Sequence, residues 1–365
     1  MIKRLEIPVA IRVDAGPQIG TGHLMRTLTL ADGLKQNGAR VRFISRTMPL
    51  HLQQMLESKG HEFVALPAAP VTGAAGDLAH SHWLNVGQAR DADDTGEALS
   101  DRLWEWMIVD HYALDARWEG PLRYCARRVL VIDDLADRTH DCDTLLDQNL
   151  YPDMERRYVG KVPASTTLLL GPRYALLREE FSRLRADHVT RDGEVRRVLV
   201  LLGGSDAHNH TRKVIHGLAQ LPAPAPAVDI VIGLQHPARA EIEALCRRHD
   251  FRLHVQTGDV AELMAAADLA IGAGGSTSWE RCCAGLPTVC LTQADNQVPI
   301  ARGLEASGAV VNLGDGGTVS AENIRDAVLA LIKEPGRLVT LSRSARQLVD
   351  GLGAQRVCEH MLSPI

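Results

Sequence analysis

Apolar positions near the start of the chain change from a strand-like run to a helix-like spacing and back. Residues 8–13 form an apolar run that predicts a strand, and the glycine-rich residues 14–23 cannot continue it. From His23 onward, leucine and alanine recur at helical spacing as far as Asn37-Gly38, where a helix is expected to stop. Residues 41–44 then resume a strand. This order predicts a β-α-β unit.

Two further strands of the first half end in carboxylates. Residues 107–109 and 129–132 have the composition of strands and are followed by Asp110 and Asp133. Polar side chains at strand ends are typical of the edge of a parallel sheet where ligands bind. We therefore expect the functional groups of this half at these strand ends.

The second half of the chain repeats the same order. Residues 198–202 form an apolar run typical of a buried strand, and Gly203-Gly204-Ser205-Asp206 follows it before a helical pattern begins. A helix is predicted at 260–267, and strands at 230–232, 253–255, 269–271 and 288–291. The alternation predicts an α/β fold of two Rossmann-like, doubly wound domains that face each other across a cleft.

The length of 365 residues also suits two domains. The charged residues 183–194 are the expected linker, because they have little apolar surface to bury. We expect an N-terminal domain over 1–185, a C-terminal domain over 195–335, and C-terminal helices over 336–365 that return toward the N-terminal domain. Residues 67–100, rich in Ala, Gly, Pro, His and Asp, predict an irregular insertion to which no chemistry is assigned.

Composition limits the partners of the protein. A net charge of -5 argues against nucleic acid as the main partner, and no stretch approaches the roughly 20 apolar residues that cross a bilayer. The N-terminus lacks the pattern of a secretion signal. The seven cysteines include no CxxC pair and predict reduced packing residues. We expect a cytoplasmic monomer without metal, cofactor, membrane or nucleic-acid partner.

The glycine-rich turn before His23 is the first candidate site. Gly20 and Gly22 allow an anion to approach backbone N–H groups where a helix begins. The turn matches neither the dinucleotide GxGxxG pattern nor a phosphate-binding Gly-Lys-Ser/Thr loop, which excludes dehydrogenases and kinases. The helix dipole favours a neutral imidazole, so His23 is a candidate general base; a capping or packing role is the alternative. Tyr112, after a strand, is a candidate to hold a sugar or water.

A second candidate site lies in the second half, where two glycine turns follow strands. Gly203-Gly204-Ser205 and Gly275-Ser276-Thr277 offer backbone donors and hydroxyl groups that suit a diphosphate. Glu280, in the helix behind the second turn, has two carboxylate oxygens that can accept from both hydroxyls of a ribose. A solvated helix carboxylate is the alternative for Glu280. Two such turns in one domain indicate a bound nucleotide.

With these residues, the chain resembles the UDP-2,4-diacetamido-2,4,6-trideoxy-β-L-altropyranose hydrolases of pseudaminic acid biosynthesis. The most specific part of the resemblance is the run from Tyr174 to Phe181. The segments that carry it are Asp14 with Ile19-Gly20-Thr21-Gly22-His23-Leu24-Met25-Arg26, Val109-Asp110-His111-Tyr112, Asp133-Asp134, Cys142-Asp143-Thr144-Leu145-Leu146-Asp147-Gln148-Asn149, Gly171-Pro172-Arg173-Tyr174-Ala175-Leu176-Leu177-Arg178-Glu179-Glu180-Phe181, Gly203-Gly204-Ser205-Asp206 and Asp295-Asn296-Gln297.

The resemblance implies a GT-B fold like that of MurG and a metal-independent hydrolysis with inversion at the anomeric carbon. It implies that His23 is the base, that Tyr112 acts beside it, and that Gly275 and Glu280 lie on the nucleotide side. The substrate-binding residues that it implies are Asp14, Gly20, Gly22, Arg26, Asn296 and Gln297. The family lacks the whole of the 67–100 insertion, and Trp279 and the chain beyond about 320 are less typical of it.

The chemistry of a UDP-sugar agrees with a single base. A nucleoside diphosphate is a good leaving group that needs little protonation, so a base on the opposite side of the sugar can suffice. Asp14 and His111 are the next candidates for the base after His23. Two other functions remain open: a MurG-like glycosyltransferase that uses a UDP-sugar donor, and a nucleotide-sugar binding protein without catalysis.

Overall fold

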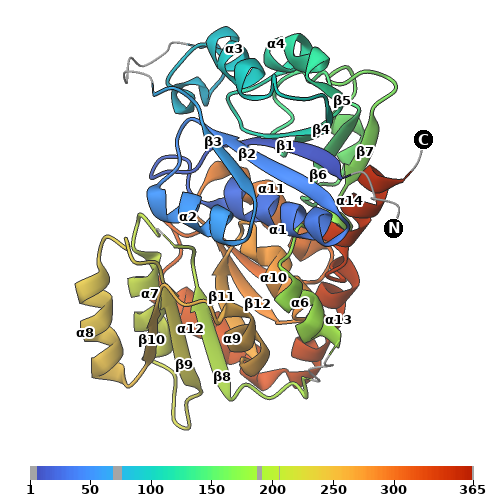
Figure 1. Ribbon diagram of the computed structural model, residues 1–365. Helices are drawn as coiled ribbons and strands as arrows, with labels where there is room; N and C mark the ends of the chain where they lie inside the picture. Colours follow the sequence, from blue (N-terminus) through green and yellow to red (C-terminus); the bar gives the residue numbers. More distant parts are fainter. Residues whose placement is uncertain (1–5, 69–75, 187–190, 205, 364–365) are drawn as a thin grey trace. The chain divides into compact units, whose positions relative to one another are not determined.

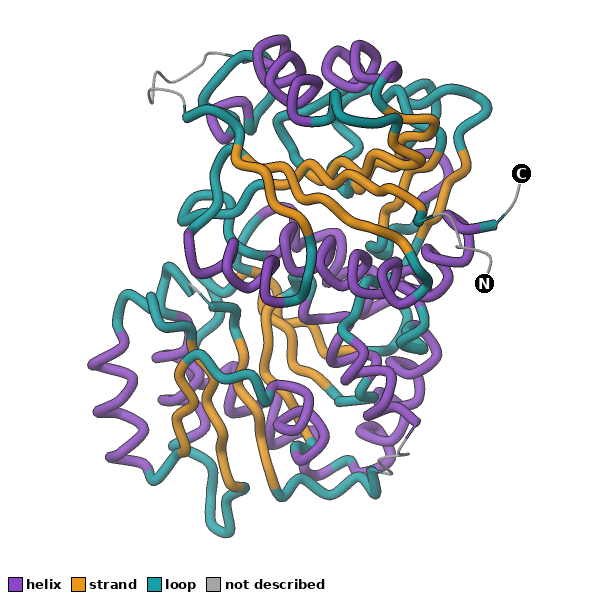
Figure 2. Tube along the Cα trace, in the orientation of Figure 1, coloured by secondary structure: helices purple, strands orange, loops and turns teal. Residues whose placement is uncertain are grey.

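The computed structural model describes residues 6–68, 76–186, 191–204 and 206–363, and the chain divides into two compact units. The N-terminal unit comprises residues 1–149, 153–176 and 353–365, and the C-terminal unit comprises 150–152 and 177–352. Each unit is a parallel sheet with helices on its faces (Figures 1 and 2). The predicted α/β fold of two Rossmann-like halves is confirmed.

The sheet of the N-terminal unit has seven strands in the order β3-β2-β1-β4-β5-β6-β7, and neighbouring strands are parallel. Its strands are β1 (Ile7–Val13), β2 (Ala39–Ser45), β3 (Glu62–Ala65), β4 (Trp104–Asp110), β5 (Ala126–Ile132), β6 (Thr144–Asp147) and β7 (Thr167–Leu170). The strand order reverses between β1 and β4, which is where a doubly wound sheet binds its ligands.

The helices of the N-terminal unit cover both faces of this sheet. They are α1 (Gly22–Gln36), α2 (Leu50–Ser58), α3 (Gln88–Ala98), α4 (Ala116–Glu119), α5 (Met154–Arg157) and α14 (Gly353–Leu362), with the 3-10 turns η1 (Ser81–Trp83), η2 (Gly120–Tyr124) and η3 (Pro172–Tyr174). Alternate residues of one strand enter opposite cores: Val9 and Ile11 pack on the α1 side, whereas Ala10 packs on the other side. Both faces are therefore apolar, as in other parallel sheets.

The C-terminal unit has a six-stranded parallel sheet in the order β10-β9-β8-β11-β12-β13. Its strands are β8 (Arg197–Leu201), β9 (Ala227–Ile232), β10 (Arg252–Val255), β11 (Leu269–Ala273), β12 (Thr288–Thr292) and β13 (Val310–Asp315). Its helices are α6 (Glu179–Ala186), α7 (His210–Leu218), α8 (Arg239–His249), α9 (Val260–Ala266), α10 (Thr277–Cys283), α11 (Val298–Ala306), α12 (Ala321–Lys333) and α13 (Pro335–Leu348), with the 3-10 turn η4 (Asp295–Gln297). The order reverses between β8 and β11.

The predicted insertion over 67–100 is not irregular in its described part. It contains η1 and the helix α3, while residues 69–75 lie outside the described residues. The inner face of α3 is polar: Asp91 and Asp94 are buried and form ion pairs with Arg12 and Arg46. Because charges fill the face that apolar side chains usually occupy, the helix has no hydrophobic periodicity to reveal it.

The unit boundaries also differ from the predicted ones. Helix α6 was expected in the N-terminal domain and α13 in a separate C-terminal segment, but both belong to the C-terminal unit. The last helix, α14, packs against α1 in the N-terminal unit (Figure 1). All seven cysteines are free and buried. In the part of the chain that the structure describes, no helix is long and apolar enough to span a membrane.

We predict that Met361→Ala destabilises the N-terminal unit by about 2–5 kcal/mol, the usual cost of removing a large buried side chain. Met361 is 1% exposed and packs in the same core as Leu24 and Leu28 of α1. Scanning calorimetry, which can separate the transitions of two units, measures the effect. The control is Glu359→Ala, an exposed change on the same helix. Equal transition temperatures for both variants would show that α14 does not stabilise this unit.

Candidate functional site

His23 lies in the first turn of α1, beside the end of β4. The preceding turn is closed by backbone hydrogen bonds between Gly16 and Gly20, and Gly20 has φ +79°, a conformation that favours glycine. A Cβ atom at Gly22 would meet no protein atom within 4 Å. The glycine at position 22 therefore leaves open space at the start of the helix, next to His23.

The imidazole of His23 is held by a buried carboxylate. Its Nδ1 lies 2.5 Å from Oδ1 of Asp110, the last residue of β4, which is fully buried. Arg26 also donates to both oxygens of Asp110, each at 2.7 Å. Burial alone raises the pKa of Asp110, but the charges of Arg26 and His23 lower it below its ordinary value overall. An ionised Asp110 holds the proton on Nδ1 of His23 and leaves Nε2 as the acceptor, as a general base requires.

Tyr112 stands next to His23 and is paired with a second carboxylate. Its ring meets the imidazole edge-on, with centroids 4.5 Å apart, and its hydroxyl donates to Oδ1 of Asp134 at 2.5 Å. Burial and the charge of Asp134 raise the pKa of Tyr112 well above 10, so the hydroxyl stays protonated. Arg26 reaches Asp134 at 3.3 Å as well as Asp110. The guanidinium of Arg26 thus joins the two carboxylates, and its predicted role in substrate binding stays a prediction.

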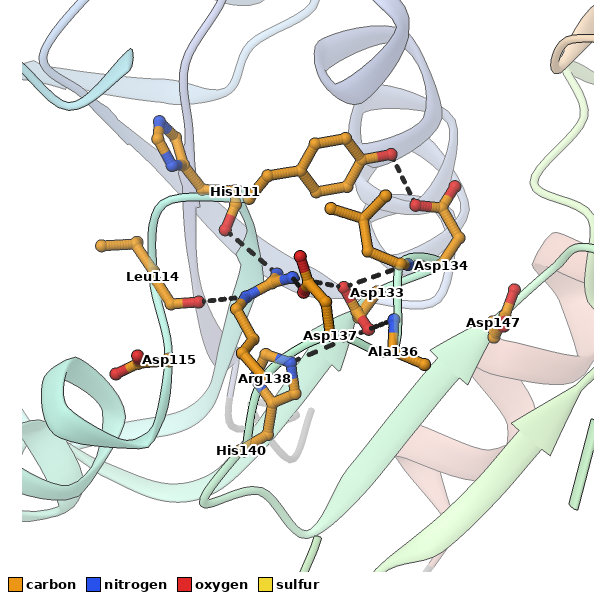
Figure 3. Close-up of polar contacts among 12 residues, drawn as sticks. His111, Leu114, Asp115, Asp133, Asp134, Ala136, Asp137, Arg138, His140 and Asp147 are labelled. Carbon is orange, nitrogen blue, oxygen red and sulfur yellow. Dashed lines mark hydrogen bonds and ion pairs between the residues drawn. The ribbon is translucent and has the colours of Figure 1, made fainter. Parts of the chain in front are cut away.

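Contacts of Arg138 connect the loop after β4 with the loop after β5, near Tyr112 and Asp134. Figure 3 shows Arg138 between these loops, where it forms an ion pair with Asp133 at 2.8 Å and donates to the carbonyl of Leu114 at 2.7 Å. Arg138 also donates to the carbonyl of His111. These contacts come from residues far apart in the chain and fix the positions of the two strand ends.

Asp14 and His111 are buried in the N-terminal unit. Asp14 is 1% exposed, and its oxygens accept from Arg12, Ser45 and the backbone of the turn after β2. His111 is 3% exposed; its Nδ1 accepts from the N–H of Ala113, and its Nε2 lies 3.1 Å from Asp14. Both side chains are thus engaged with protein groups in this structure. Their roles as a substrate ligand and as alternative bases stay predictions.

Sequence reasoning missed two aromatic side chains of the site, His80 and Trp83. The indole of Trp83 stacks on the ring of Tyr112 with a centroid separation of 5.5 Å and an interplanar angle of 26°. His80 contacts Tyr112 at 5.2 Å, and Trp83 lies 6.1 Å from His23. The insertion, to which no chemistry was assigned, therefore brings side chains into contact with the candidate residues Tyr112 and His23. The run His80-Ser81-His82-Trp83 was the available signal, because aromatic and imidazole groups stand out in a segment of small residues.

In the C-terminal unit, a glycine turn follows β8, which is the central strand that pairs with β11. Gly203 has φ +92°, and a Cβ at Gly203 or Gly204 would meet no protein atom within 4 Å. Ser205 lies outside the described residues. Asp206 caps α7 by accepting from the N–H groups of His210 and Thr211. The turn leaves open space beside its backbone, as an anion-binding turn needs.

The turn after β11 lies beside the turn after β12. The turn after β12 contains Asn296 and Gln297, which were predicted to bind the sugar. The side chain of Gln297 comes close to Gly275, and its Oε1 accepts from the N–H of Gln293 at 3.0 Å. Ser276 and Asn296 are exposed, and Thr277 begins α10. Gln293 in turn donates to Asp206 at 3.0 Å. The turns after β8, β11 and β12 are thus joined at the carboxyl edge of one sheet.

A buried guanidinium lies beneath the turn after β11, and sequence reasoning did not identify it. Arg281 is 1% exposed and donates to the carbonyl of Ala273 at 2.6 Å and to the hydroxyl groups of Thr277 and Ser278. Among the described residues no carboxylate forms an ion pair with it. A Cβ at Gly272 would lie 2.4 Å from the guanidinium, so only glycine fits there. This charge favours an anion at the turn above it.

Glu280 is the acidic residue nearest to this turn on α10. Its side chain is 19% exposed, and its Oε1 lies 3.9 Å from a guanidinium nitrogen of Arg178. Burial raises the pKa of Glu280 to about 7, and the charge of Arg178 opposes this shift. The described residues include no group of three or more His, Cys, Asp or Glu side chains placed to hold a metal ion.

The sequence is distantly similar to known proteins. No family profile matches the chain. It is 24% identical to the spore coat polysaccharide biosynthesis protein SpsG of Bacillus subtilis over 96% of both chains. It is 23% identical to the UDP-2,4-diacetamido-2,4,6-trideoxy-beta-L-altropyranose hydrolase of Campylobacter jejuni, over 70% of this chain and 81% of that protein.

Solved structures define the class. The structure matches Acinetobacter baumannii MurG with a TM-score of 0.68 at 16% identity, over 98% of this chain and 99% of that one. It matches the glycotransferase of kitacinnamycin with a TM-score of 0.67 at 17% identity, over 98% of this chain and 100% of that one. The chain therefore has the GT-B fold, as the resemblance implied.

We predict that Asp14→Asn lowers the free energy of unfolding of the N-terminal unit by about 3–5 kcal/mol at pH 7, the usual cost of breaking a buried ion pair. Burial raises the pKa of Asp14, but Arg12 and His111 lower it well below its usual value. The stabilisation is therefore present above pH ~4 and lost as the pH falls below it. Denaturant unfolding at several pH values should show the two proteins converging in acid.

The matched control is Asp32→Asn, because Asp32 is 33% exposed and pairs with the exposed Lys59 and with the buried His61. The exposed pair with Lys59 contributes about 1 kcal/mol or less. A variant Asp14→Asn with normal stability that failed to bind ligand would place Asp14 in the substrate site.

Proposed function

We propose that the protein is a hydrolase of pseudaminic acid biosynthesis that cleaves a UDP-linked 2,4-diacetamido-2,4,6-trideoxy sugar into UDP and the free sugar, with inversion. The GT-B fold and the joined turns of the C-terminal unit support an enzyme that acts on a nucleotide sugar. The observation that carries the reaction is the pair of His23 with buried Asp110, which leaves Nε2 of His23 as a proton acceptor.

In this proposal, a water molecule attacks the anomeric carbon while its proton passes to Nε2 of His23. The bond between the anomeric carbon and the diphosphate oxygen breaks, and UDP leaves with the electron pair. Attack from the side opposite the leaving group inverts the anomeric configuration. Asp110 stabilises the imidazolium that forms, and Tyr112, kept protonated, is placed to hold the water or a hydroxyl group of the sugar.

The UDP group is assigned to the C-terminal unit. The open backbone around Gly203, Gly204 and Gly275 and the buried charge of Arg281 would stabilise the negative charge that grows on the leaving diphosphate. Ser205, Ser276 and Thr277 are assigned to the same diphosphate and Glu280 to the ribose. Asn296 and Gln297, with Gly20 and Gly22 of the other unit, are assigned to the sugar. The partner of the protein is thus a small UDP-sugar substrate.

A glycosyltransferase is the second candidate, and one observation favours it. Part of the chain is 32% identical to a UDP-N-acetylglucosamine transferase of Xanthomonas campestris pv. campestris, over 51% of this chain and 45% of that protein. The same histidine could remove a proton from the hydroxyl group of an acceptor. The two functions differ in whether the sugar is released without an acceptor.

The decisive experiment is incubation of the protein with UDP-2,4-diacetamido-2,4,6-trideoxy-β-L-altropyranose alone. Proton NMR follows the products, because the coupling of the anomeric proton reports both cleavage and configuration. We expect free sugar of inverted configuration and one UDP per sugar over many turnovers. Cleavage that requires an added acceptor would instead establish a transferase, and binding without any turnover would establish a binding protein.

We predict that His23→Asn lowers kcat by roughly 10²–10⁴, the usual loss for a general base, with little change in the affinity for UDP. Asparagine keeps a polar side chain but cannot accept the proton. Steady-state kinetics and calorimetric titration with UDP measure the two quantities. His51→Asn, on the exposed side of α2, is the control and should behave as the unmodified protein. Lost UDP binding in His23→Asn would place the diphosphate at the turn before His23.

We predict that Glu280→Gln weakens UDP binding about 10–100-fold at pH 8, the range for hydrogen bonds to a charged group, and that kcat changes less. Because the pKa of Glu280 is about 7, the unmodified protein should bind UDP more weakly as the pH falls from 8 to 6. The glutamine variant should lose this dependence. Arg178, the cation beside Glu280, also pairs with Glu180 at 2.9 Å. A fall in kcat with normal UDP affinity would move Glu280 into the chemistry.

A further inference from the structure

The turn η1 and the residue before it bring two aromatic side chains to the catalytic histidine. Trp83 and Tyr112 stack face to face, and His80 meets both rings, with its centroid 4.6 Å from Trp83 and 5.2 Å from Tyr112. His23 touches the same group through Tyr112. We call Trp83 and His80 the aromatic platform.

The platform has hydrogen-bonding groups that the described protein leaves unused. Nδ1 of His80 is buried and has no hydrogen-bond partner among the described residues. The indole N–H of Trp83, which is only partly buried, also makes no hydrogen bond within that part of the chain. Buried polar atoms are normally paired, and an unpaired one needs an explanation. A ligand that supplies the missing partners is the simplest one.

The exposure of Trp83 also sets it apart. The other four tryptophans are at most 1% exposed and pack inside their units: Trp104, Trp106, Trp118 and Trp279. Trp83 is only partly buried. An indole at a surface beside a catalytic group combines a broad apolar face with a polar edge, which suits a ligand that has both.

We propose that the aromatic platform is a binding subsite for the sugar ring, and that it selects sugars carrying acetamido groups. The apolar C–H face of the ring would pack on Trp83. An acetamido group offers a methyl group for the aromatic surface, an N–H donor for Nδ1 of His80 and a carbonyl acceptor for the indole N–H. The proposal rests on the proposed function, because it takes the sugar to be the group that lies at His23.

The charges around the platform fit a neutral ligand. Burial lowers the pKa of His80, which leaves its imidazole neutral at pH 7 and Nδ1 able to accept a hydrogen bond. The carboxylates nearest to the catalytic group, Asp110 and Asp134, are engaged by Arg26. These carboxylates would repel a diphosphate. An uncharged sugar would instead contact aromatic rings and charges that are already paired.

The test compares binding of UDP and UDP-2,4-diacetamido-2,4,6-trideoxy-β-L-altropyranose in a His23→Asn background, in which turnover is slow. The ratio of the two Kd values isolates the contribution of the sugar. We expect Trp83→Ala to reduce this ratio about 2- to 10-fold while UDP alone binds normally, because the aromatic face for the sugar is lost. Trp83→Phe should keep most of the ratio, and His80→Ala should reduce it.

The matched control is His82→Ala on the same turn, because His82 is exposed and, within the described part of the chain, meets only the edge of Trp83 at 6.2 Å and not Tyr112. Circular dichroism and thermal unfolding establish that each variant is folded. Fluorescence adds a readout that a purely structural role would not change. Because the other tryptophans are buried, the UDP-sugar but not UDP should alter the emission of Trp83, and Trp83→Phe should abolish the change.

The possible results distinguish the proposed sugar subsite from the proposed hydrolase activity. An unchanged ratio in Trp83→Ala, or an equal loss of UDP and UDP-sugar affinity, would overturn the subsite. A UDP-sugar that binds no more tightly than UDP to the His23→Asn parent would overturn it as well. Normal platform behaviour in a protein that releases no free sugar would support the subsite and refute only the hydrolase.

Discussion

The N-terminal site depends on the pairing of the buried carboxylate of Asp110 with Arg26 and His23. A charge at the end of a central strand is costly unless it is paired, and here Arg26 and His23 pair with it from the first turns of α1. The same contacts set the proton on His23 and the position of Arg26, which in turn reaches Asp134 and therefore Tyr112. The need to pair one buried charge thus orders His23, Tyr112 and the aromatic side chains that pack on them.

The two units use their strand ends for opposite electrostatic purposes. In the N-terminal unit these ends carry carboxylates, which disfavour a diphosphate but stabilise an imidazolium. In the C-terminal unit the ends carry open glycine turns over the buried cation of Arg281, which favour an anion. This contrast supports the assignment of UDP to the C-terminal unit and of the reacting carbon to the N-terminal unit. It also explains why similar glycine turns in the two halves are assigned different ligands.

The insertion shows how a polar segment can be both structural and functional. Helix α3 is held by Arg12 and Arg46 through Asp91 and Asp94, so charges attach it where apolar packing usually would. The nearby turn then presents Trp83 and His80 to Tyr112. Arg12 also pairs with Asp14, which lies at the start of the glycine-rich turn before His23. The ion pairs that hold α3 therefore share Arg12 with the contacts of this turn.

The sequence alone determined the elements whose signal is local. Apolar runs located the strands that were predicted, and the glycine turns and His23 followed from residues adjacent in the chain. Glu280 and the turns around Gly204 and Gly275 were recognisable for the same reason. What the sequence could not decide was which charged residues are buried together. Asp14 and Asp110 both follow strands, yet one is sealed by Arg12 and the other faces His23.

Only the tertiary structure made that distinction, because the partners are 79 to 108 positions apart in the chain for Arg12 with Asp91, His23 with Asp110, and Arg26 with Asp134. The same limit hid Trp83 and His80, whose role depends on a stack with a tyrosine from another strand end. Local hydrophobic patterns fix where strands and helices form, since burial acts on each element separately. The pairing of charges and rings depends on which elements the fold brings side by side.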